Sequence, residues 1–533
     1  MKDWQIADQA TASALQLAWL EHEIEPVSEC GRRIFASLRP FAPGEEFAAA
    51  ARAERVALLA RSVPPATVDA LRDTLHAAPD LGPVLARAAA GDALTDADFL
   101  ELQRLLDALA SIRELSGNEE IDLKGAAVSR VSAALAPGHS RTDGFYLADA
   151  FDSALAEGRA ALQRAETSYA QARERIASRV AAQLGREELA YEFIVMRDEL
   201  SAALPPEVRV IREAPSYLLC ELELDEEGLR ALETRDAAIE HCAGLQDEVR
   251  ARLSAAVRPA ALALERLTQQ LGETDVLFAH VRFTQRHTCV PAQIVSGGGL
   301  EFSEARFLPL AAELVREGRA YVPVSLRLPN VAVITGPNMG GKSAALRTAG
   351  TIALLAAFGI PVPAASARLG LFERIAWLGI GTETAPGGLL SSFAAEVRRL
   401  RDILAMSGNR TLVLVDEFAR TTTPNEGRAL LVAVVQSLLE RSITAFFATH
   451  LSGVAEAAGV THVAVRGLRG VPTPSAHDNL QEALAALAAS MDYSIEEVTD
   501  GREPHADAIA LAHLLGLDER IVAAARRALV SSA

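Results

Sequence analysis

The sequence predicts an α + α/β multidomain protein, in which a helical part is followed by an α/β part with a mostly parallel sheet. Before residue 290 the apolar residues recur at helical spacing, and Pro and Gly interrupt them only at intervals. After Pro291 short apolar runs alternate with amphipathic helical patterns, as in parallel sheets covered by helices. A glycine-rich loop follows one of these runs. We therefore expect two domains, residues 1–290 and residues 291–533.

The first domain is expected to consist mainly of long helices. Residues 1–121 are rich in Ala, Leu and Arg at helical spacing, and residues 149–184 form a charged pattern almost free of helix breakers. Helix is expected again from residue 226 to about residue 284. Between these helices, residues 208–224 alternate between apolar and polar side chains, which predicts a short β-hairpin within about residues 190–228.

The composition is that of an acidic protein with enough apolar residues for an ample core. The 533 residues are 50% hydrophobic, with a net charge of −18 and a pI near 5.2. Four cysteines without paired spacing indicate reduced thiols in a cytoplasmic protein. Neither a signal peptide nor a membrane-spanning run is evident, so no membrane partner is expected. Because Lys and Arg supply most affinity for DNA, the acidity argues weakly against DNA binding.

Four apolar runs are expected to form the parallel sheet of the second domain: 331–335, 375–379, 411–415 and 443–448. The first leads into GPNMGGKS at residues 336–343, which fits the pattern G-x-x-x-x-G-K-[S/T] between a strand and a helix. Backbone N–H groups of such a loop bind phosphate oxygens, assisted by the positive end of the following helix. Lys342 can then reach the β- and γ-phosphates, and the Ser343 hydroxyl can bind Mg²⁺. The sequence thus predicts a nucleoside triphosphate site.

Two other strand ends carry residues suited to phosphate chemistry. Asp416 would hold Mg²⁺ through its water shell, and Glu417 would orient and polarise the attacking water. His450 follows the run 443–448 and could sense the γ-phosphate. Ser391 and Ser392 precede a charged helix, where an N-cap role is by itself a sufficient explanation.

Together these motifs resemble those of the MutS family of mismatch-repair ATPases, dimeric members of the wider ABC-type ATPase group. Residues 335–343 closely resemble the family's phosphate loop, and residues 391–396 (SSFAAE) resemble its signature segment. Residues 412–417 are similar to its magnesium and base strand, and residues 448–450 to its histidine switch. Residues 509–526 resemble the closing helix-turn-helix that helps to join two ATPase domains. The resemblance is strong after about residue 300 and weak before it.

The resemblance implies a composite site for ATP and Mg²⁺ in a homodimer. The catalytic residues would be Glu417 and His450, with Ser391 reaching the γ-phosphate from the other protomer. The metal would be held by Ser343 and Asp416. ATP would join the protomers reversibly, and its hydrolysis would move the helical part, which corresponds to the family's core and lever domain. The residues that bind the nucleotide would be Gly336, Pro337, Asn338, Met339, Gly340, Gly341, Lys342 and Ser343.

Departures from the family pattern bear on the choice of partner. The mismatch-reading and connector domains are expected to be missing, which would make the chain a short member of the family. The hairpin stands where the family has a DNA clamp, but it is shorter and ends in the acidic run 221–227. Residues 419–422 (ARTT) replace a glycine-rich loop, Leu451 replaces a usual Tyr, and residues 506–508 replace a usual Ser-Tyr-Gly.

Two functions of different class follow from these observations. The first is a mismatch-repair-related or DNA-structure-binding ATPase, whose dimer encloses double-stranded or branched DNA. The second is a protein-remodelling ATPase, such as the ATPase subunit of a reactivating factor for a cobalamin-dependent aminomutase. A third possibility is an ATP-gated structural dimer that has lost its partner.

Overall fold

The computed structural model divides the chain into two compact units. Unit 1 comprises residues 1–76 and 271–533, and unit 2 comprises residues 77–270. The first 76 residues thus group with the C-terminal part, a division that differs from a single boundary near residue 290. The described residues are 4–116, 125–138, 144–200, 203–337, 340–379, 392–406, 408, 410–468, 491–498, 509, 512–513 and 517–532.

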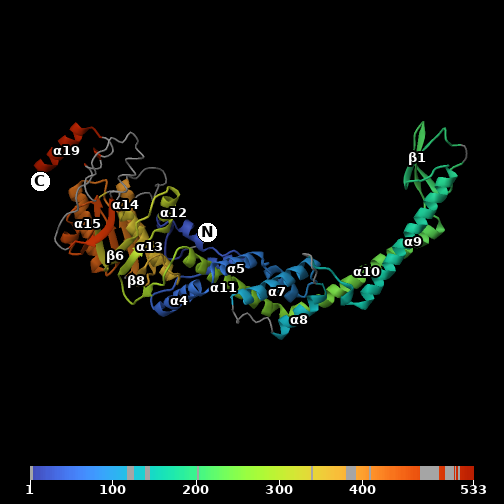
Figure 1. The fold of residues 1–533 in the computed structure, drawn as a ribbon, viewed down its shortest axis with the longest axis horizontal. Coiled ribbons are helices and arrows are strands. Elements are labelled where there is room, and N and C mark those ends of the chain that lie inside the picture. Colours follow the sequence, from blue (N-terminus) through green and yellow to red (C-terminus); the bar gives the residue numbers. More distant parts are fainter. Residues whose placement is uncertain are drawn as a thin grey trace. The chain divides into compact units, whose positions relative to one another are not determined.

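Unit 2 is built on two long antiparallel helices, α9 (Ser153–Gln183) and α10 (Glu226–Val257), which lie side by side (Figure 1). Each begins at an aspartate N-cap, since Asp152 accepts from the N–H of Ala154 and Asp225 from that of Gly228. The long helix expected at residues 149–184 is therefore confirmed as α9. The other helices of this unit are α6 (Gly82–Ala90), α7 (Asp96–Ser116) and α8 (Ala126–Leu135), with 3-10 turns at Ala136–Gly138, Asp149–Phe151 and Arg258–Ala260.

The helix expected from residue 226 to about residue 284 is interrupted in the structure. It consists of α10, the 3-10 turn Arg258–Ala260 and α11 (Ala261–Arg286). The turn contains Pro259, which has no N–H to donate within a helix and so occupies its first residues. The boundary between the two units falls inside α11.

The segment between α9 and α10 forms a three-stranded antiparallel sheet rather than the two-stranded hairpin expected. Its strands β1 (Glu192–Met196), β2 (Val208–Glu213) and β3 (Tyr217–Leu222) have the order β1-β3-β2. The additional strand is β1, where Phe193 and Val195 are buried in alternation. They pack in one cluster with Ile176 and Val180 of α9, so the alternation follows from one face of the sheet lying on the helix.

The main sheet of unit 1 has six strands in the order β13-β12-β7-β11-β10-β9. Five strands run parallel, and β13 pairs antiparallel with β12 at one edge. The four expected strands are confirmed to within one residue, and every residue of β7 and β11 is buried, as both faces of a parallel sheet are covered. The bounds are β7 (Val331–Thr335), β9 (Arg374–Leu378), β10 (Thr411–Asp416), β11 (Thr444–Ala448), β12 (Thr461–Leu468) and β13 (Met491–Glu497).

A second sheet of unit 1 has the order β4-β8-β5-β6 and consists of β4 (Gln293–Ile294), β5 (Leu300–Ala305), β6 (Val324–Leu328) and β8 (Ser366–Leu369). The helices of this unit are α1 (Gln9–Ala14), α2 (Leu17–Ile24), α3 (Glu29–Ser37), α4 (Glu46–Ser62), α5 (Pro65–Ala77), α12 (Leu308–Arg316), α13 (Lys342–Ala357), α14 (Ser392–Met406), α15 (Pro424–Glu440), α16 (Val454–Ala458) and α19 (Glu519–Ser532). Across both units, no helix within the described ranges has the length and apolarity to cross a membrane.

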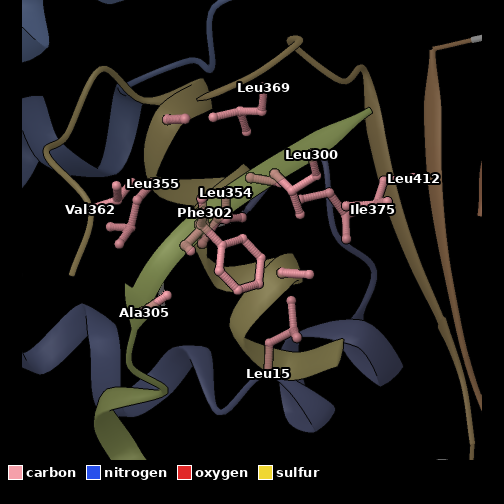
Figure 2. Packing of buried hydrophobic residues seen from close by; sticks show 14 of the residues in the cluster. Leu15, Leu300, Phe302, Ala305, Leu354, Leu355, Val362, Leu369, Ile375 and Leu412 are labelled. Carbon is pink, nitrogen blue, oxygen red and sulfur yellow. The ribbon is translucent and has the colours of Figure 1, made fainter. Parts of the chain in front are cut away.

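Helix α13 lies at the centre of the largest hydrophobic core. Its residues 348–357 are all buried, so this helix is apolar around its circumference rather than on one face. Figure 2 shows side chains of α13, the second sheet, the main sheet and the N-terminal segment (residues 4–28) in one cluster. The labelled members from these four parts include Leu354, Leu355, Phe302, Ile375, Leu412 and Leu15.

The N-terminal segment also covers the outer edge of the main sheet. Ala7 forms a parallel bridge with Ile375 of β9, and the N–H of Ile375 donates to the carbonyl of Ile6 at 2.7 Å. The ring of Trp4 meets that of Phe358 edge-on, with 5.2 Å between centroids. Because an uncovered edge strand presents unpaired backbone groups, these contacts make the N-terminal segment part of unit 1.

The burial of Leu15 predicts that this segment contributes to the stability of unit 1. Leu15 is 1% exposed, so Leu15→Ala should lower the free energy of unfolding by about 2–5 kcal/mol. The matched control is Leu58→Ala on α4, because Leu58 is 58% exposed and its loss should change stability by less than about 0.5 kcal/mol. Urea unfolding followed by tryptophan fluorescence measures both. Equal effects of the two substitutions would contradict the placement of the segment in the core.

Candidate nucleotide-binding site

Three neighbouring strands of the main sheet end at the same edge. Strands β7, β11 and β10 are adjacent and parallel, and Phe447 of β11 pairs with Val333 on one side and Val415 on the other. The segments that follow these strands are therefore brought together at their carboxyl ends, where ligands bind in sheets of this kind. They are residues 336–343, residues 449–450 and residues 416–417.

The loop after β7 has a backbone that only glycine adopts easily. Gly336 has φ of +141° and Gly341, the N-cap of α13, has φ of +91°. A Cβ at Gly336 would lie 2.9 Å from the Cβ of Val465, and one at Gly340 would lie 2.9 Å from the carbonyl oxygen of Pro337. The glycines therefore leave the space that a phosphate-binding loop requires. Asn338 and Met339 lie outside the described residues.

Lys342 is held against this loop. Its Nζ donates to the carbonyl oxygens of Gly336 at 2.8 Å and Pro337 at 3.0 Å, and the residue is only 4% exposed. Burial lowers the pKa of the Lys342 amine, although the nearby carboxylates of Glu417 and Asp416 act in the opposite direction. The amine is thus held by the loop, and its charge is favoured by both carboxylates.

Ser343 and Asp416 meet directly. The Ser343 hydroxyl donates to Oδ1 of Asp416 at 3.0 Å. Burial raises the pKa of the Asp416 carboxyl, and the charge of Glu417 adds to this, while the hydrogen bond from Ser343 and the charges of Arg347 and Lys342 oppose it. A hydroxyl and a carboxylate that converge in this way are suited to a hard cation such as Mg²⁺.

Glu417 stands in a strained turn. Its φ is +57° and that of Ala419 is +62°, a left-handed conformation that costs a non-glycine residue about 1–3 kcal/mol. The turn is fixed by two hydrogen bonds: the N–H of Glu417 donates to Ala448 at 2.9 Å, and the N–H of Ala419 donates to Oε2 of Glu396 on α14 at 2.8 Å. Glycine would adopt this conformation without strain. Ala419 belongs to the segment 419–422, which replaces a glycine-rich loop of the MutS family.

His450 follows β11 at the same edge with an exposed side chain, whereas Thr449 before it is buried. The Thr449 N–H donates to the carbonyl of Ile334 at 3.0 Å, and the Thr449 hydroxyl accepts from the N–H of Leu451 at 3.1 Å. These bonds fix the backbone on both sides of His450 and leave its imidazole toward solvent. Ser391 lies outside the described residues.

The structure adds two features that sequence analysis missed. The Oγ1 of Thr335, directly before the loop, lies 2.7 Å from Nε2 of His462, whose Nδ1 lies 2.9 Å from Oε1 of Glu456. Arg347 lies one helical turn after Ser343 and acts on the pKa of Asp416. The i,i+4 spacing of Ser343 and Arg347 could have revealed the second feature. The first joins residues 127 apart in sequence, so no local pattern could have revealed it.

The residues present fit a nucleotide with Mg²⁺ rather than a metal held by protein alone. Among the described residues, no group of three His, Cys, Asp or Glu side chains could hold a metal ion. Mg²⁺ in nucleotide sites takes one or two protein ligands and completes its coordination with phosphates and water. Ser343 and Asp416 supply that number of ligands, beside the space left by Gly336 and Gly340.

The raised pKa of Asp416 predicts how stability depends on pH. With no nucleotide or Mg²⁺ added, a charged Asp416 costs stability above its folded-state pKa, and that cost disappears as pH falls toward the ordinary value of 3.8. Asp416→Asn should therefore be more stable than the wild type at pH 8, and the difference should shrink as pH falls toward 5. Thermal unfolding at each pH measures it, with the exposed Asp73→Asn on α5 as control. A less stable Asn variant at pH 8 would contradict the dominant effect of burial.

Comparison with known proteins agrees with this geometry. Residues 332–531 match the family model described as MutS domain V. Three relatives carry the name Endonuclease MutS2. That of Maridesulfovibrio salexigens is 35% identical over 195 residues, which cover 36% of this chain and 25% of the relative. That of Thermus thermophilus is 40% identical over 146 residues (27% and 19%), and that of Thermotoga maritima is 29% identical over 273 residues (49% and 32%).

The matches cover no more than 32% of each of these relatives, so the chain spans less than a third of their length. The family model begins within β7 and extends to the end of α19, so it includes every described residue of the candidate site from Thr335 to His462. On this evidence residues 332–531, which hold the candidate site, form a domain of the type described as MutS domain V.

Proposed function

We propose that this protein binds and hydrolyses ATP with Mg²⁺ at the shared edge of β7, β11 and β10, as a P-loop ATPase of the ABC type. The observation that carries the proposal is the 3.0 Å hydrogen bond between Ser343 and Asp416. It joins the residue after the loop lysine to the carboxylate at the end of β10, the two groups that hold Mg²⁺ in this class. The match to MutS domain V supports the same reading.

Each residue then has a definite task. The N–H groups of residues 340–343, at the end of the loop and the start of α13, bind the phosphates, and Lys342 exchanges the carbonyls of Gly336 and Pro337 for phosphate oxygens. Mg²⁺, when bound with ATP, supplies positive charge opposite the phosphate oxygens. Glu417 takes the proton of the attacking water at its carboxylate, and His450 orients that water.

The working assembly is proposed to be a homodimer. Ser391 of the other protomer would complete each site, as the family resemblance implies. Residues 509–526, which resemble the family's closing helix-turn-helix, support a second protomer, and α19 forms the last part of that segment.

The proposed load is double-stranded or branched DNA, whose binding would be coupled to movement of the helical part. The relatives' name, Endonuclease MutS2, supports a nucleic-acid substrate. Helices α9 and α10 of unit 2 would serve as the levers, with the β1-β3-β2 sheet in the place of the family's clamp. Nucleotide state would then decide how the dimer holds DNA.

A protein-remodelling ATPase, such as the ATPase subunit of an aminomutase reactivating factor, is the second candidate because the clamp-like segment is acidic. Residues 190–228 contain three Arg and no Lys against ten Asp and Glu, so their net charge is 3 − 10 = −7. Arg197 pairs with Glu213, and Arg209 pairs with Glu221 and Glu223. Cations already paired within the segment have less charge to offer DNA phosphates, which favours a protein partner at this sheet.

The ATP site can be tested with two substitutions. Lys342→Ala should weaken ATP binding by roughly 100-fold, because it removes a charged donor to the phosphates. Glu417→Gln should retain binding but lower kcat by about 100-fold or more, because it removes the base. Titration with a fluorescent ATP analogue and a phosphate-release assay measure the two effects. Arg401→Ala on the exposed face of α14 is the control; unchanged ATP affinity in the Lys342 variant would refute the site.

The nature of the load is tested by measuring ATP turnover with and without a DNA panel of duplex, mismatched and junction molecules. If DNA is the load, turnover should change and affinity should fall by ~10³-fold between 50 and 200 mM salt, as expected for about six phosphate contacts. A flat titration at low salt with intact ATPase activity would exclude DNA. Capture of an aminomutase-like protein by the Glu417→Gln variant would then favour the second candidate.

A further inference from the structure

We infer that Asp8 and Arg399 position helix α14, and through α14 the strained turn that carries the proposed base Glu417. The inference rests on the proposed ATPase function and assigns these two as positioning residues, since neither is among the residues proposed to bind the nucleotide or Mg²⁺. Asp8, Thr11, Trp377 and Arg399 are together called the N-terminal clasp. All four lie in unit 1, although Asp8 and Arg399 are 391 residues apart in sequence.

Arg399 of α14 is bound on every side of its guanidinium. Its Nη1 donates to Oδ2 of Asp8 at 2.6 Å, and its Nη2 donates to Oδ1 of Asp8 at 2.9 Å and more weakly to Oγ1 of Thr11 at 3.4 Å. Its Nε donates to the carbonyl of Trp377 at 3.2 Å. The side chain is 10% exposed. The Asp8 side chain is 38% exposed, but a bidentate pair with a buried arginine fixes both distance and orientation, so α14 is held in one rotation about its axis.

The other side of the clasp belongs to the start of the chain. Asp8 is the N-cap of α1, and its Oδ1 accepts from the N–H of Thr11 at 2.9 Å and from the Thr11 hydroxyl at 2.7 Å. Burial acts to raise the pKa of the Asp8 carboxyl, but hydrogen bonds from Arg399 and Thr11 outweigh it and lower the pKa. The carboxylate is thus charged at neutral pH, as the ion pair requires.

Trp377 connects both sides of the clasp to the main sheet. On β9, at the sheet edge, its N–H donates to the Thr11 hydroxyl at 3.0 Å and its carbonyl accepts from Arg399. Side chains from α1 and α14 therefore take the hydrogen bonds that a further strand would make. Helix α14 cannot shift along this edge without breaking bonds to Asp8 and to Trp377.

The same helix contacts the proposed catalytic turn. Glu396 lies three residues before Arg399, on a neighbouring part of the α14 surface, and its Oε2 accepts from the N–H of Ala419 at 2.8 Å. Ala419 and Glu417 both have positive φ, a conformation that persists only when surrounding contacts impose it. The clasp therefore fixes the position of Glu396, which accepts the hydrogen bond from Ala419 and so stabilises the turn. The turn, held in its place, sets the direction of the Glu417 carboxylate.

Kinetic measurements separate positioning from binding. Asp8→Asn keeps the cap acceptor for Thr11 but removes the negative charge. Arg399→Lys keeps the positive charge but removes the guanidinium that makes the bidentate contact. Both should lower kcat about 10-fold, a loss expected from a misplaced catalytic group, while the Kd for ATP stays within about twofold. Arg401→Lys on the same helix, where the side chain is 72% exposed, should change neither. Leu15→Ala, which weakens the nearby core, should lower stability but not kcat at 20 °C. A matching loss of kcat in Leu15→Ala would assign the effect to stability and overturn the inference.

A double-mutant cycle tests the route through Glu396. Glu396→Ala alone should also lower kcat about 10-fold, and Glu396→Ala combined with Arg399→Lys should be no slower than the slower single variant, because both remove the same support. Multiplying losses would show two independent effects and would contradict the proposed route.

Hydrogen exchange tests whether the clasp supports the turn, independently of ATP hydrolysis. Without nucleotide, peptides from residues 416–423 should exchange about 10-fold faster in Asp8→Asn and in Arg399→Lys than in the wild type, because the Ala419 N–H loses its acceptor. Peptides from α15 should exchange unchanged, as should all peptides of Arg401→Lys. Unaltered exchange at 416–423 in both clasp variants would overturn the inference. A wild type that does not hydrolyse ATP would refute the proposed function and leave this measurement to decide the clasp.

Discussion

The parallel pairing of β7, β11 and β10 determines where the chemistry of this protein can occur. All three strands are buried on both faces, so their sequences stay apolar until the strand ends. Charged residues appear only at those ends, and the parallel register brings the ends to one edge. Lys342, Ser343, Asp416 and Glu417 therefore meet because of backbone pairing, before any attraction between their side chains is considered.

The turn after β10 is strained and depends on support from neighbouring elements. Two non-glycine residues, Glu417 and Ala419, have positive φ there, and each costs about 1–3 kcal/mol unless neighbours compensate. The neighbours are β11, which accepts from Glu417 through Ala448, and α14, which accepts from Ala419 through Glu396. Burial raises the pKa of the Glu396 carboxyl even though the Ala419 N–H and the charge of Arg420 favour its ionised form. The turn is thus stabilised by one central strand of the main sheet and by one helix outside the sheet.

How much the sequence could predict follows from the range of the interactions involved. The strands at 331–335 and 411–415 were predictable because full burial produces continuous apolar runs, and the loop at 336–343 because its glycines answer a local backbone requirement. Strand β1 was missed because five residues with two buried side chains give a weak alternation. Contacts such as Asp8 with Arg399 and Thr335 with His462 join distant segments, and one sequence contains no periodicity that reports them.

The N-terminal segment, residues 4–28, is attached to the rest of unit 1 at a second point besides the clasp. Asp275 of α11 accepts from the N–H of Ser28 at 2.6 Å, from its hydroxyl at 2.6 Å and from the N–H of Val27 at 3.2 Å. A Cβ at Gly31 would lie 2.4 Å from Oδ2 of Asp275, so α3 approaches α11 this closely only with glycine there.

The segment that binds α14 at Asp8 therefore binds α11 some twenty residues later. Helix α11 begins at Ala261 in unit 2 and continues into unit 1. Coupling between a nucleotide site and a distant domain needs a physical element in contact with both. Residues 8–28 contact α14, which supports the turn of Glu417, and the part of α11 that belongs to unit 1. The first thirty residues therefore link α14 to α11 within unit 1, and α11 is the helix in which the chain passes from unit 2 to unit 1.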